Sequence, residues 1–507
     1  MATREREFQA SERMSDHEAL MWNIEKDPWL NPNGASLTLL DRPVDIDDFR
    51  RQVRHGVSRI PRLQQRVVPG LGRLATPAWV PDPEFDFDYH FRQAALPKPG
   101  SKRQLLNLAA RLYNEPLDRT RPLWRFVVID GLADGSGAIY TMFHHAISDG
   151  IGQIRMAELY QQMTRDEPPK PEVDLDAIIA EAVKQHSSKQ RGGDLGEDLW
   201  STARGTLGHL ARRNIGIGRR LIGDIAMIPA DPKRLTDGAS SVASAAQAMV
   251  SQVGTIASDD HDGSELWAER SRHRQLEHVA VPLADLKAAS KALGGSINDA
   301  FLVALAEAAV RYHSARGVEL DGLNTSFVVS TRTDSKAGGN SFTPVPIHIS
   351  GAELSFAERM TDLLTITEAA KARALEGGSI TNLSGVANLL PTSVVTRTAR
   401  SQAAKIDFAT SNLRGAPFEL YCAGARVESI VAMGPLAGTP ANITALSYNG
   451  SFDIGIFIDP DAITKPAEFR DHIASAFADM ISEAKEVRQA PSEPESATET
   501  GEEAAEQ

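Results

Sequence analysis

The stretch that decides the fold is RFVVIDGLADGSGAIYTMFHHAISDGIGQIRMAELYQQMT, residues 125–164. Two short runs with strand-like composition, 125–130 and 137–143, are joined by GLADGSG, whose Gly and Asp residues favour a turn. We therefore expect a hairpin, followed by a helix over 150–164. The polar stretch HHAISDG then lies at the end of a strand and directly before a helix.

The histidines and the aspartate of this stretch are candidates for acid–base chemistry. Histidine has an unperturbed pKa of about 6.5, so a neutral imidazole can accept a proton at neutral pH, and His144 and His145 are candidate general bases. Asp149 can orient an imidazole or fix the loop by pairing with an arginine, and Gly150 permits a close backbone approach. Because no Ser or Cys stands in a G-x-S-x-G nucleophile elbow, these residues favour direct transfer over a covalent acyl-enzyme.

Two other interpretations of HHAISDG stay open on the residues alone. A histidine beside an apolar strand is most often structural. Imidazole and carboxylate groups also ligate zinc or iron, so His144, His145 and Asp149 could form a metal site. Adjacent residues on a strand point to opposite faces, however, so the two histidines could hardly bind one ion, and we expect no metal.

The chain divides into four segments by pattern and composition. We expect an N-terminal α/β lobe over 1–165 and a second α/β lobe over 275–489, because strand-like runs and helical periodicity occur in both. The crossover between them, 166–274, is rich in Gly, Ser, Ala and Arg. The last segment, 490–507, is acidic and poor in apolar residues, so we expect a disordered tail.

Two local signals support the second lobe. Ser296 and Asp299 form the capping-box pattern of a helix that should end near Gly317. Asn449-Gly450 between two strand-like runs is the signature of a tight hairpin turn. Both signals predict compact α/β structure here.

The crossover contains STARGTLGHLARRNIGIGRRLI, residues 201–222, with five arginines and no acidic residue. At helical spacing an apolar face opposes a basic one, which is typical of helices that lie on membrane surfaces. The alternative is a linker helix packed across the two lobes. The basic face would consist of Arg212, Arg213, Arg219 and Arg220.

The composition of the chain excludes several classes of protein. The 507 residues carry 54 basic and 67 acidic side chains, a formal charge of −13 that argues against nucleic-acid binding. The single cysteine excludes a disulfide scaffold. The N-terminal MATREREFQASERM lacks the apolar region of a secretory signal. We expect a cytoplasmic protein with two domains.

Taken together, the motifs resemble a known enzyme family. HHAISDG matches the HHxxxDG motif of the coenzyme-A-dependent acyltransferase superfamily, which includes condensation domains and chloramphenicol acetyltransferase. RPLWRFVVIDGL and SINDAFLVAL resemble segments of one branch, the bacterial wax ester synthase/diacylglycerol acyltransferases. The similarity runs in order from about Met14 to Ala484, through FDYHFRQAALPKPGS, EPLDRTRPLW, STRTDSKAGGN, TSNLRGAP and SYNGSFDIGIFID. It implies two α/β lobes like those of chloramphenicol acetyltransferase, with an active-site channel between them.

The resemblance also implies roles for the residues of HHAISDG. His145 looks like the general base that takes the proton of an alcohol, while His144 shapes the site. Asp149 resembles the family aspartate that turns away from substrate and pairs with an arginine. The expected partner of this carboxylate is Arg62 or Arg66.

Further residues have a weaker assignment. Asn298 at the start of a helix could help hold the thioester or its oxyanion, whereas Asp299 is more readily explained as a helix cap. The PLW segment is expected to pack or to form the wall of an acyl channel. It consists of Pro122, Leu123 and Trp124.

The resemblance implies the substrates as well. A long-chain fatty acyl-CoA would transfer its acyl group to diacylglycerol or to a long-chain alcohol, giving triacylglycerol or a wax ester. CoA is a co-substrate, so no cofactor is expected, and lipid substrates imply peripheral contact with a membrane or lipid droplet. The alternatives are a condensation-type enzyme with another hydroxyl or amine acceptor, and a lipid-surface protein without activity.

Overall fold

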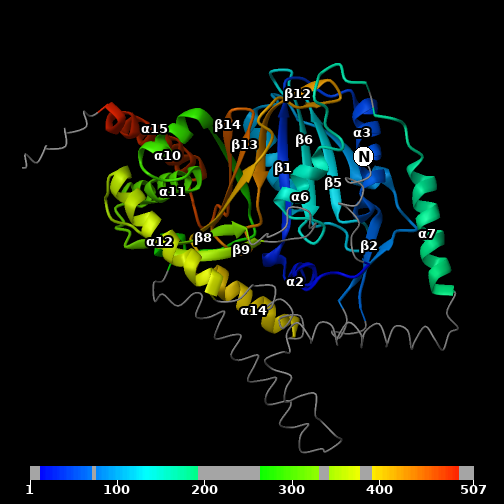
Figure 1. Ribbon diagram of the computed structural model, residues 1–507, viewed down its shortest axis with the longest axis horizontal. Helices are drawn as coiled ribbons and strands as arrows, with labels where there is room; N and C mark the ends of the chain where they lie inside the picture. Colours follow the sequence, from blue (N-terminus) through cyan, green and yellow to red (C-terminus); the bar gives the residue numbers. More distant parts are fainter. Residues whose placement is uncertain are drawn as a thin grey trace, which may run out of the picture.

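The computed structural model describes residues 12–70, 76–168, 170–191, 263–330, 342–376 and 391–489. Two six-stranded mixed sheets form the centres of two lobes, and helices pack on both (Figure 1). The two-lobed α/β fold predicted from the sequence is confirmed.

The first sheet contains the predicted hairpin. Its strands lie in the order β11 (Tyr421–Cys422), β12 (Ala425–Met433), β1 (Asn33–Leu40), β6 (Gly137–His144), β5 (Trp124–Asp130) and β4 (Phe91–Ala95). Strands β5 and β6 pair antiparallel from Trp124–Phe143 to Ile129–Ala138. The hairpin therefore delivers the HHAISDG stretch at the end of β6.

The first sheet also contains strands from the second half of the chain. The sequence pattern predicts a single lobe for 275–489, whereas β11 and β12 cross over to the sheet of the other lobe. Strand β12 pairs antiparallel with β1, from Ala35–Met433 to Leu40–Val427. This pairing gives β1 a hydrogen-bonded neighbour on its second edge, which β6 does not cover. The second half of the chain thus contributes two strands to the first lobe.

Helices cover both faces of the first sheet. Helices α3 (Ile46–Arg59), α6 (Gly150–Ala157) and α7 (Leu175–Arg191) share one core with Phe143. Helices α2 (Asp16–Ile24) and α5 (Lys102–Asn114) share the other core with Met142. The smaller elements of this lobe are η1 (Pro28–Leu30), η2 (Pro61–Gln64), β2 (Gln65–Val68), β3 (Ala78–Pro81) and α4 (Phe87–His90).

The helix predicted over 150–164 is shorter than expected. Helix α6 ends at Ala157. Five residues further on, Gln162 exchanges two backbone hydrogen bonds with Tyr421, of 2.8 and 2.9 Å, and these take the chain out of the helix. The prediction was wrong because the partner lies more than 250 residues away in sequence.

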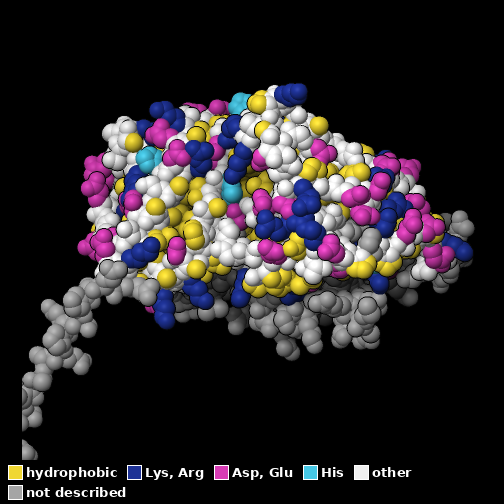
Figure 2. Space-filling view, turned by 90° about the horizontal axis from the view of Figure 1, so that it is seen from above, with side chains coloured by type: hydrophobic (Ala, Val, Ile, Leu, Met, Phe, Trp, Pro, Cys, Tyr) yellow, Lys and Arg dark blue, Asp and Glu magenta, His cyan; other side chains and the backbone are white. Residues whose placement is uncertain are grey.

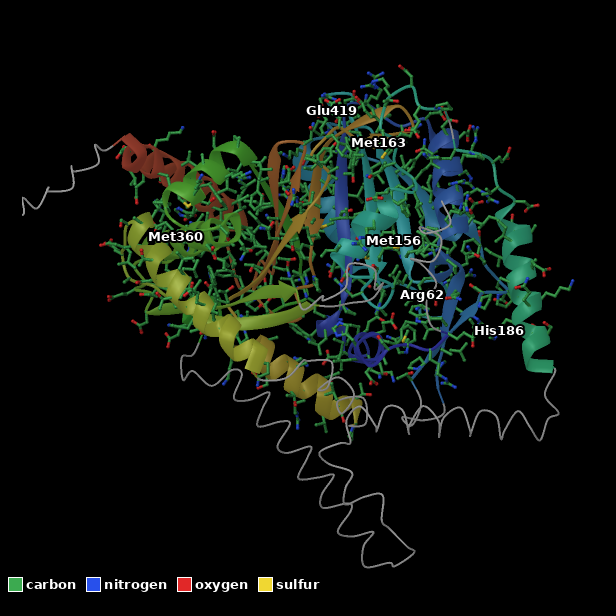
Figure 3. All side chains as sticks on the ribbon, viewed as in Figure 1. Arg62, Met156, Met163, His186, Met360 and Glu419 are labelled. Atoms are coloured by element: carbon green, nitrogen blue, oxygen red, sulfur yellow. The ribbon has the colours of Figure 1, made fainter. Side chains whose placement is uncertain are left out.

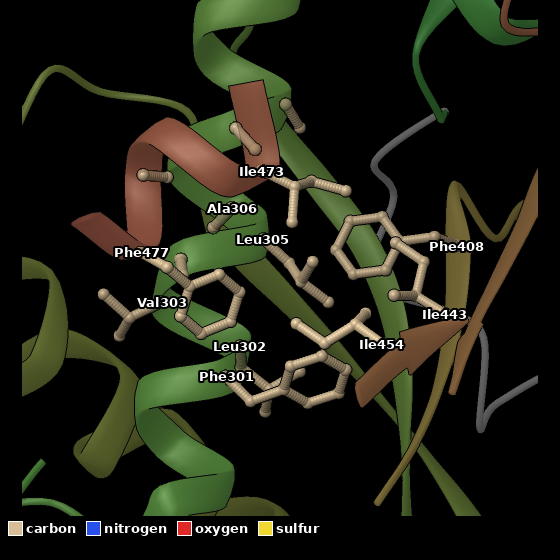
Figure 4. Packing of buried hydrophobic residues seen from close by; sticks show 14 of the residues in the cluster. Phe301, Leu302, Val303, Leu305, Ala306, Phe408, Ile443, Ile454, Ile473 and Phe477 are labelled. Carbon is tan, nitrogen blue, oxygen red and sulfur yellow. The ribbon is translucent and has the colours of Figure 1, made fainter. Parts of the chain in front are cut away.

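The second sheet has a core of its own. Its strands lie in the order β7 (Gln275–Pro282), β14 (Ser451–Ile458), β13 (Ala441–Tyr448), β10 (Phe408–Arg414), β8 (Gly322–Ser330) and β9 (Phe342–Ser350). Its helices are α10 (Leu283–Ala292), α11 (Ile297–Ser314), α12 (Phe356–Glu376), α14 (Thr392–Ala403) and α15 (Pro466–Gln489), with the short η3 (Glu265–Trp267). Figure 4 shows Phe301 and Leu305 of α11 in one cluster with Ile454 of β14.

The local signals of the second lobe are confirmed. Ser296 and Asp299 form a complete capping box at the start of α11. Gly317, three residues past its end, has a positive φ of 67°. Asn449 and Gly450, with φ of 42° and 84°, form the turn between β13 and β14.

Two predicted segments fall on parts of the chain that the structure does not describe. Arg212, Arg213, Arg219 and Arg220 lie outside the described residues, and so does the tail 490–507. Within the described part, no single helix is long and apolar enough to cross a membrane. Helices α10 and α11 pass that test only as a pair bent by 91°.

Candidate active site

The two motif histidines lie where β6 ends. His144 is the last residue of β6 and pairs with Asn33 of β1, and its backbone N–H donates to the Leu123 carbonyl at 3.0 Å. The backbone N–H of His145 donates to the carbonyl of Pro32 at 3.2 Å. These hydrogen bonds fix the backbone at both histidines against neighbouring segments. The two side chains can therefore point in different directions.

The His144 ring is fully buried on the α2 side of the sheet. Its Nδ1 accepts a hydrogen bond from the backbone N–H of Ala146 at 2.9 Å, so the neutral ring carries its proton on Nε2. That Nε2 lies 3.5 Å from Oε2 of Glu25, and the edge of the ring faces Trp22. The ring is thus held in one orientation and one tautomer.

A half-buried charge pair lies behind His144. Glu25 forms an ion pair with Arg119, whose guanidinium also donates to the Trp22 carbonyl at 2.9 Å. Burial raises the pKa of Glu25, but His144 and Arg119 outweigh burial and hold the pKa below its usual range. Glu25 therefore presents a negative charge to His144 at neutral pH.

His145 lies on the other side of the strand end and is half-buried. A methyl group added to Gly34 of β1 would lie 3.3 Å from His145 Nε2 and 3.2 Å from Gln153 Nε2. Burial, followed by the charges of His144 and His17, lowers the pKa of His145 to about 4. The ring is therefore neutral at pH 7, which is the state required of a general base.

Asp149 caps helix α6. Its Oδ1 accepts from the backbone N–H of Gly152 at 2.8 Å. The two arginines that the sequence analysis considered for Asp149 face other carboxylates: Arg62 lies 3.7 Å from Glu18, and Arg66 lies 4.0 Å from Asp82. The pairing of Asp149 with one of these arginines therefore stays a prediction.

Gly150 brings the two lobes into contact. A Cβ at this position would lie 3.0 Å from Cδ2 of Leu413, on strand β10 of the second sheet. The Leu413 side chain would have to shift to admit a side chain here. The glycine of HHAISDG thus permits a close approach between lobes.

The PLW segment packs. Leu123 and Trp124 are buried, and the indole N–H of Trp124 donates to the Leu63 carbonyl at 2.8 Å. The indole also stacks on the His90 ring, with centroids 4.5 Å apart. Of the two roles expected for Pro122, Leu123 and Trp124, packing is the one that these contacts support.

Asn298 and Asp299 belong to the second lobe. Asp299 Oδ2 accepts from the backbone N–H of Ser296 at 2.8 Å and from its hydroxyl at 2.6 Å, so its carboxylate serves the helix cap. Asn298 lies in the first turn of α11, which packs on α10, α12 and α15. The structure places this pair in the second lobe, whereas HHAISDG follows β6 of the first sheet.

Two cavities are lined by neighbours of the two histidines, although not by the histidines themselves. The first has a volume of 680 Å³ and is lined by Glu25, which faces His144, and by Tyr113. The second has a volume of 780 Å³ and is lined by Gln153, which shares the space beside Gly34 with His145, and by Phe143. We call them the Glu25 cavity and the Gln153 cavity. Each histidine thus has one neighbour, Glu25 or Gln153, that lines a different cavity.

Several residues that lie next to the histidines could not be identified from the sequence. Glu25 and His17 lie on or next to α2 and carry no motif. Gly34 did carry a signal, since a glycine inside a strand pattern often marks a close approach. Within the described chain, no group of three or more His, Cys, Asp or Glu side chains is placed to hold a metal ion.

Profiles of known families match most of the chain. Residues 14–301 match the wax ester synthase/diacylglycerol acyltransferase catalytic domain. Residues 338–481 match the C-terminal domain of the same family. The HHAISDG stretch and its helix lie within the first match.

Individual proteins are similar over nearly the full length. A Mycobacterium tuberculosis protein assigned as a diacylglycerol O-acyltransferase is 29% identical over 478 residues, 93% of each chain. The structure of the wax ester synthase/diacylglycerol acyltransferase of Marinobacter aquaeolei VT8 aligns with a TM-score of 0.60 at 21% identity, covering 93% of this chain and all of the other. The first condensation domain of the CDA synthetase aligns at 0.51 and 16% identity, covering 94% and 98%.

Proposed function

The chain belongs to the wax ester synthase/diacylglycerol acyltransferase family, and we propose that it moves a long-chain acyl group from CoA to the hydroxyl of diacylglycerol or of a long-chain alcohol. Its activity is that of an acyl-CoA-dependent O-acyltransferase. The products are triacylglycerol or wax ester, with free CoA.

In the proposed mechanism His145 is the general base. Nε2 accepts the hydroxyl proton while the oxygen attacks the thioester carbonyl and forms a tetrahedral intermediate. The C–S bond then breaks, and the CoA thiolate takes the proton from the imidazolium, which restores neutral His145. The observation that carries this role is a neutral, half-buried ring whose Nε2 lies beside Gln153, a residue of the 780 Å³ cavity.

The other motif residues position the base in this proposal. His144, with its Nδ1 occupied by Ala146 and its Nε2 aimed at Glu25, supports the strand end. Asp149 holds the first turn of α6, and with it the loop between His145 and the helix. No step calls for a resident cofactor, because the thioester is already activated and the imidazole moves the proton. We expect dialysis against EDTA to leave the rate unchanged.

The experiment is the His145→Ala variant with palmitoyl-CoA. Diacylglycerol and hexadecanol are offered together, CoA release is followed with a thiol reagent, and products are separated by thin-layer chromatography. We expect CoA release to fall by about 10²–10⁴-fold, while Val487→Ser, an exposed change on α15, keeps the native rate. Near-native transfer by His145→Ala would exclude the mechanism, and the native product pattern assigns the acceptor.

Lipid substrates require contact with a lipid surface. We propose that the basic face of the 201–222 segment contributes to such contact through attraction to anionic lipid. Reversal of its four arginines should weaken binding to anionic vesicles. The four are Arg212, Arg213, Arg219 and Arg220.

A further inference from the structure

Large exposed hydrophobic side chains gather at the mouth of the Gln153 cavity. Ile151, Met163 and Phe418 have exposed fractions of 42%, 58% and 45%, and all three line this cavity. Single exposed hydrophobic residues are ordinary on a protein surface, but three around one opening mark a site of interaction. We call these three residues the rim.

The rim is assembled from three separate segments that are tied together. Ile151 lies in the first turn of α6, and Phe418 lies in the connection between β10 and β11. The backbone N–H of Met163 donates to Glu167 at 2.8 Å, and the preceding residue, Gln162, is bonded to Tyr421. Figure 3 shows Met163 and Glu419 at the same end of the first lobe.

The lining behind the rim is mainly apolar, although the hydroxyl residues Ser36, Thr38 and Thr141 of the sheet also contribute to it. The lining includes Phe49, Ile139 and Phe143 from one lobe and Leu413 and Leu446 from the other. Mainly apolar side chains therefore line the cavity between the rim and Gln153, the neighbour of His145. Such a lining suits a hydrocarbon chain.

The charges around the opening compensate one another. Lys170 lies 2.9 Å from Glu167, and Arg426 lies 3.4 Å from Glu419. The charged lining residues are of both signs: Arg155, Lys170, Arg414, Glu158 and Glu167. Figure 2, which views the molecule from above, also shows both signs mixed over the first lobe. This balance favours a neutral surface over an anionic one.

We propose that the rim of Ile151, Met163 and Phe418 inserts into a neutral lipid surface, so that a lipid substrate enters the Gln153 cavity without crossing water. The inference rests on the proposed function, which supplies a water-insoluble substrate. It differs from the contact proposed for 201–222, because insertion of apolar side chains depends little on salt.

The test is flotation with phosphatidylcholine vesicles that contain diacylglycerol. The rim variant carries Ile151→Gln, Met163→Gln and Phe418→Gln, and a Met163→Gln/Phe418→Gln double variant leaves α6 untouched. The matched control changes three exposed hydrophobic residues elsewhere: Ile178→Gln, Val394→Gln and Val487→Gln. Thermal unfolding checks that each variant folds.

We expect each rim substitution to weaken partitioning by about 5-fold, so that the triple variant loses roughly 100-fold. The control should float like the native protein, and raising NaCl from 0.05 to 0.5 M should change native flotation by less than about 2-fold. Equal flotation of rim and native proteins would overturn the proposal, and so would flotation abolished by salt. A native dimer that the rim substitutions convert to monomer, seen by analytical ultracentrifugation, would assign the rim to a second copy instead.

Flotation requires no catalysis, so the two proposals can fail separately. If the native protein releases no CoA but floats through its rim, the proposed function is wrong and the rim stands. If it transfers acyl groups but its flotation does not depend on the rim, the proposed function stands and the rim proposal is wrong.

Discussion

The substitution Gly34→Ala tests the geometry of the proposed base most directly. The new methyl carbon would lie 3.3 Å from His145 Nε2 and 3.2 Å from Gln153 Nε2. Ordinary carbon–nitrogen contacts are a few tenths of an ångström longer, so both side chains must move. Gly34 pairs with Phe143 of β6, and the next residue, Ala35, pairs with both β6 and β12, so the backbone cannot easily yield.

We expect Gly34→Ala to have a small effect on stability and a large effect on the catalytic rate. Gly→Ala in a strand with ordinary φ gains about 0.5–1 kcal/mol through the unfolded chain, and the tight contacts offset part of this gain. We expect the free energy of unfolding to change by less than about 1 kcal/mol. Displacement of a catalytic group by up to an ångström can cost about 10²-fold in rate, so kcat should fall by roughly 10–100-fold.

The assay compares kcat for CoA release with the midpoint of urea unfolding on the same preparations. Gly56→Ala is the matched control, because its methyl would meet Tyr160 at an ordinary 3.6 Å inside helix α3. The control should keep native kcat. Native kcat in Gly34→Ala, or a loss of rate fully accounted for by unfolding, would refute the placement of His145 as the base.

Three further predictions concern charge and capping. Because the pKa of His145 is lowered to about 4, kcat/KM should rise with pH around pH 4 and stay level from about pH 5 to 8; an inflection between pH 6 and 7 would contradict this. His144 and Arg119 hold the pKa of Glu25 low in the folded protein. Ionised Glu25 therefore stabilises the fold at pH values above its pKa in the unfolded chain, and this contribution is lost as the pH falls through its lower pKa in the folded protein. Glu25→Gln should therefore cost about 1–2 kcal/mol at pH 7 and much less below about pH 4, in denaturant titrations at both pH values; an equal cost at both would contradict it. Ser296→Ala removes the cap of α11 and should cost about 1 kcal/mol of stability while leaving kcat unchanged; a fall in kcat at full folding would instead connect this helix start with catalysis.

Much of the local structure could be predicted because its causes are short-range. The turn 131–136 joins two strand-like runs, and the structure has the predicted hairpin there. Ser296 and Asp299 lie three residues apart, and they form the capping box as predicted. The positive φ of Gly450 follows from its place in an Asn-Gly turn. In each case the interacting groups are neighbours in sequence.

The surroundings of the histidines could not be predicted, because they depend on contacts across long stretches of chain. Glu25 reaches His144 from a helix 119 positions earlier, and Gly34 reaches His145 only because β1 and β6 pair in one register. A shift of that register by one residue would turn every side chain of β1 to the other face.

The sequence by itself determined the motif, its position at the end of a strand, and the two-lobed α/β class, since composition and periodicity carry that information. Only the tertiary structure decided what the motif residues face. It aimed His144 at Glu25 and His145 at the space beside Gly34, brought Leu413 against Gly150, and moved 421–433 into the first sheet. The physical reason is that strand pairing and lobe contact select partners by position in space, whereas a linear pattern records only its own neighbours.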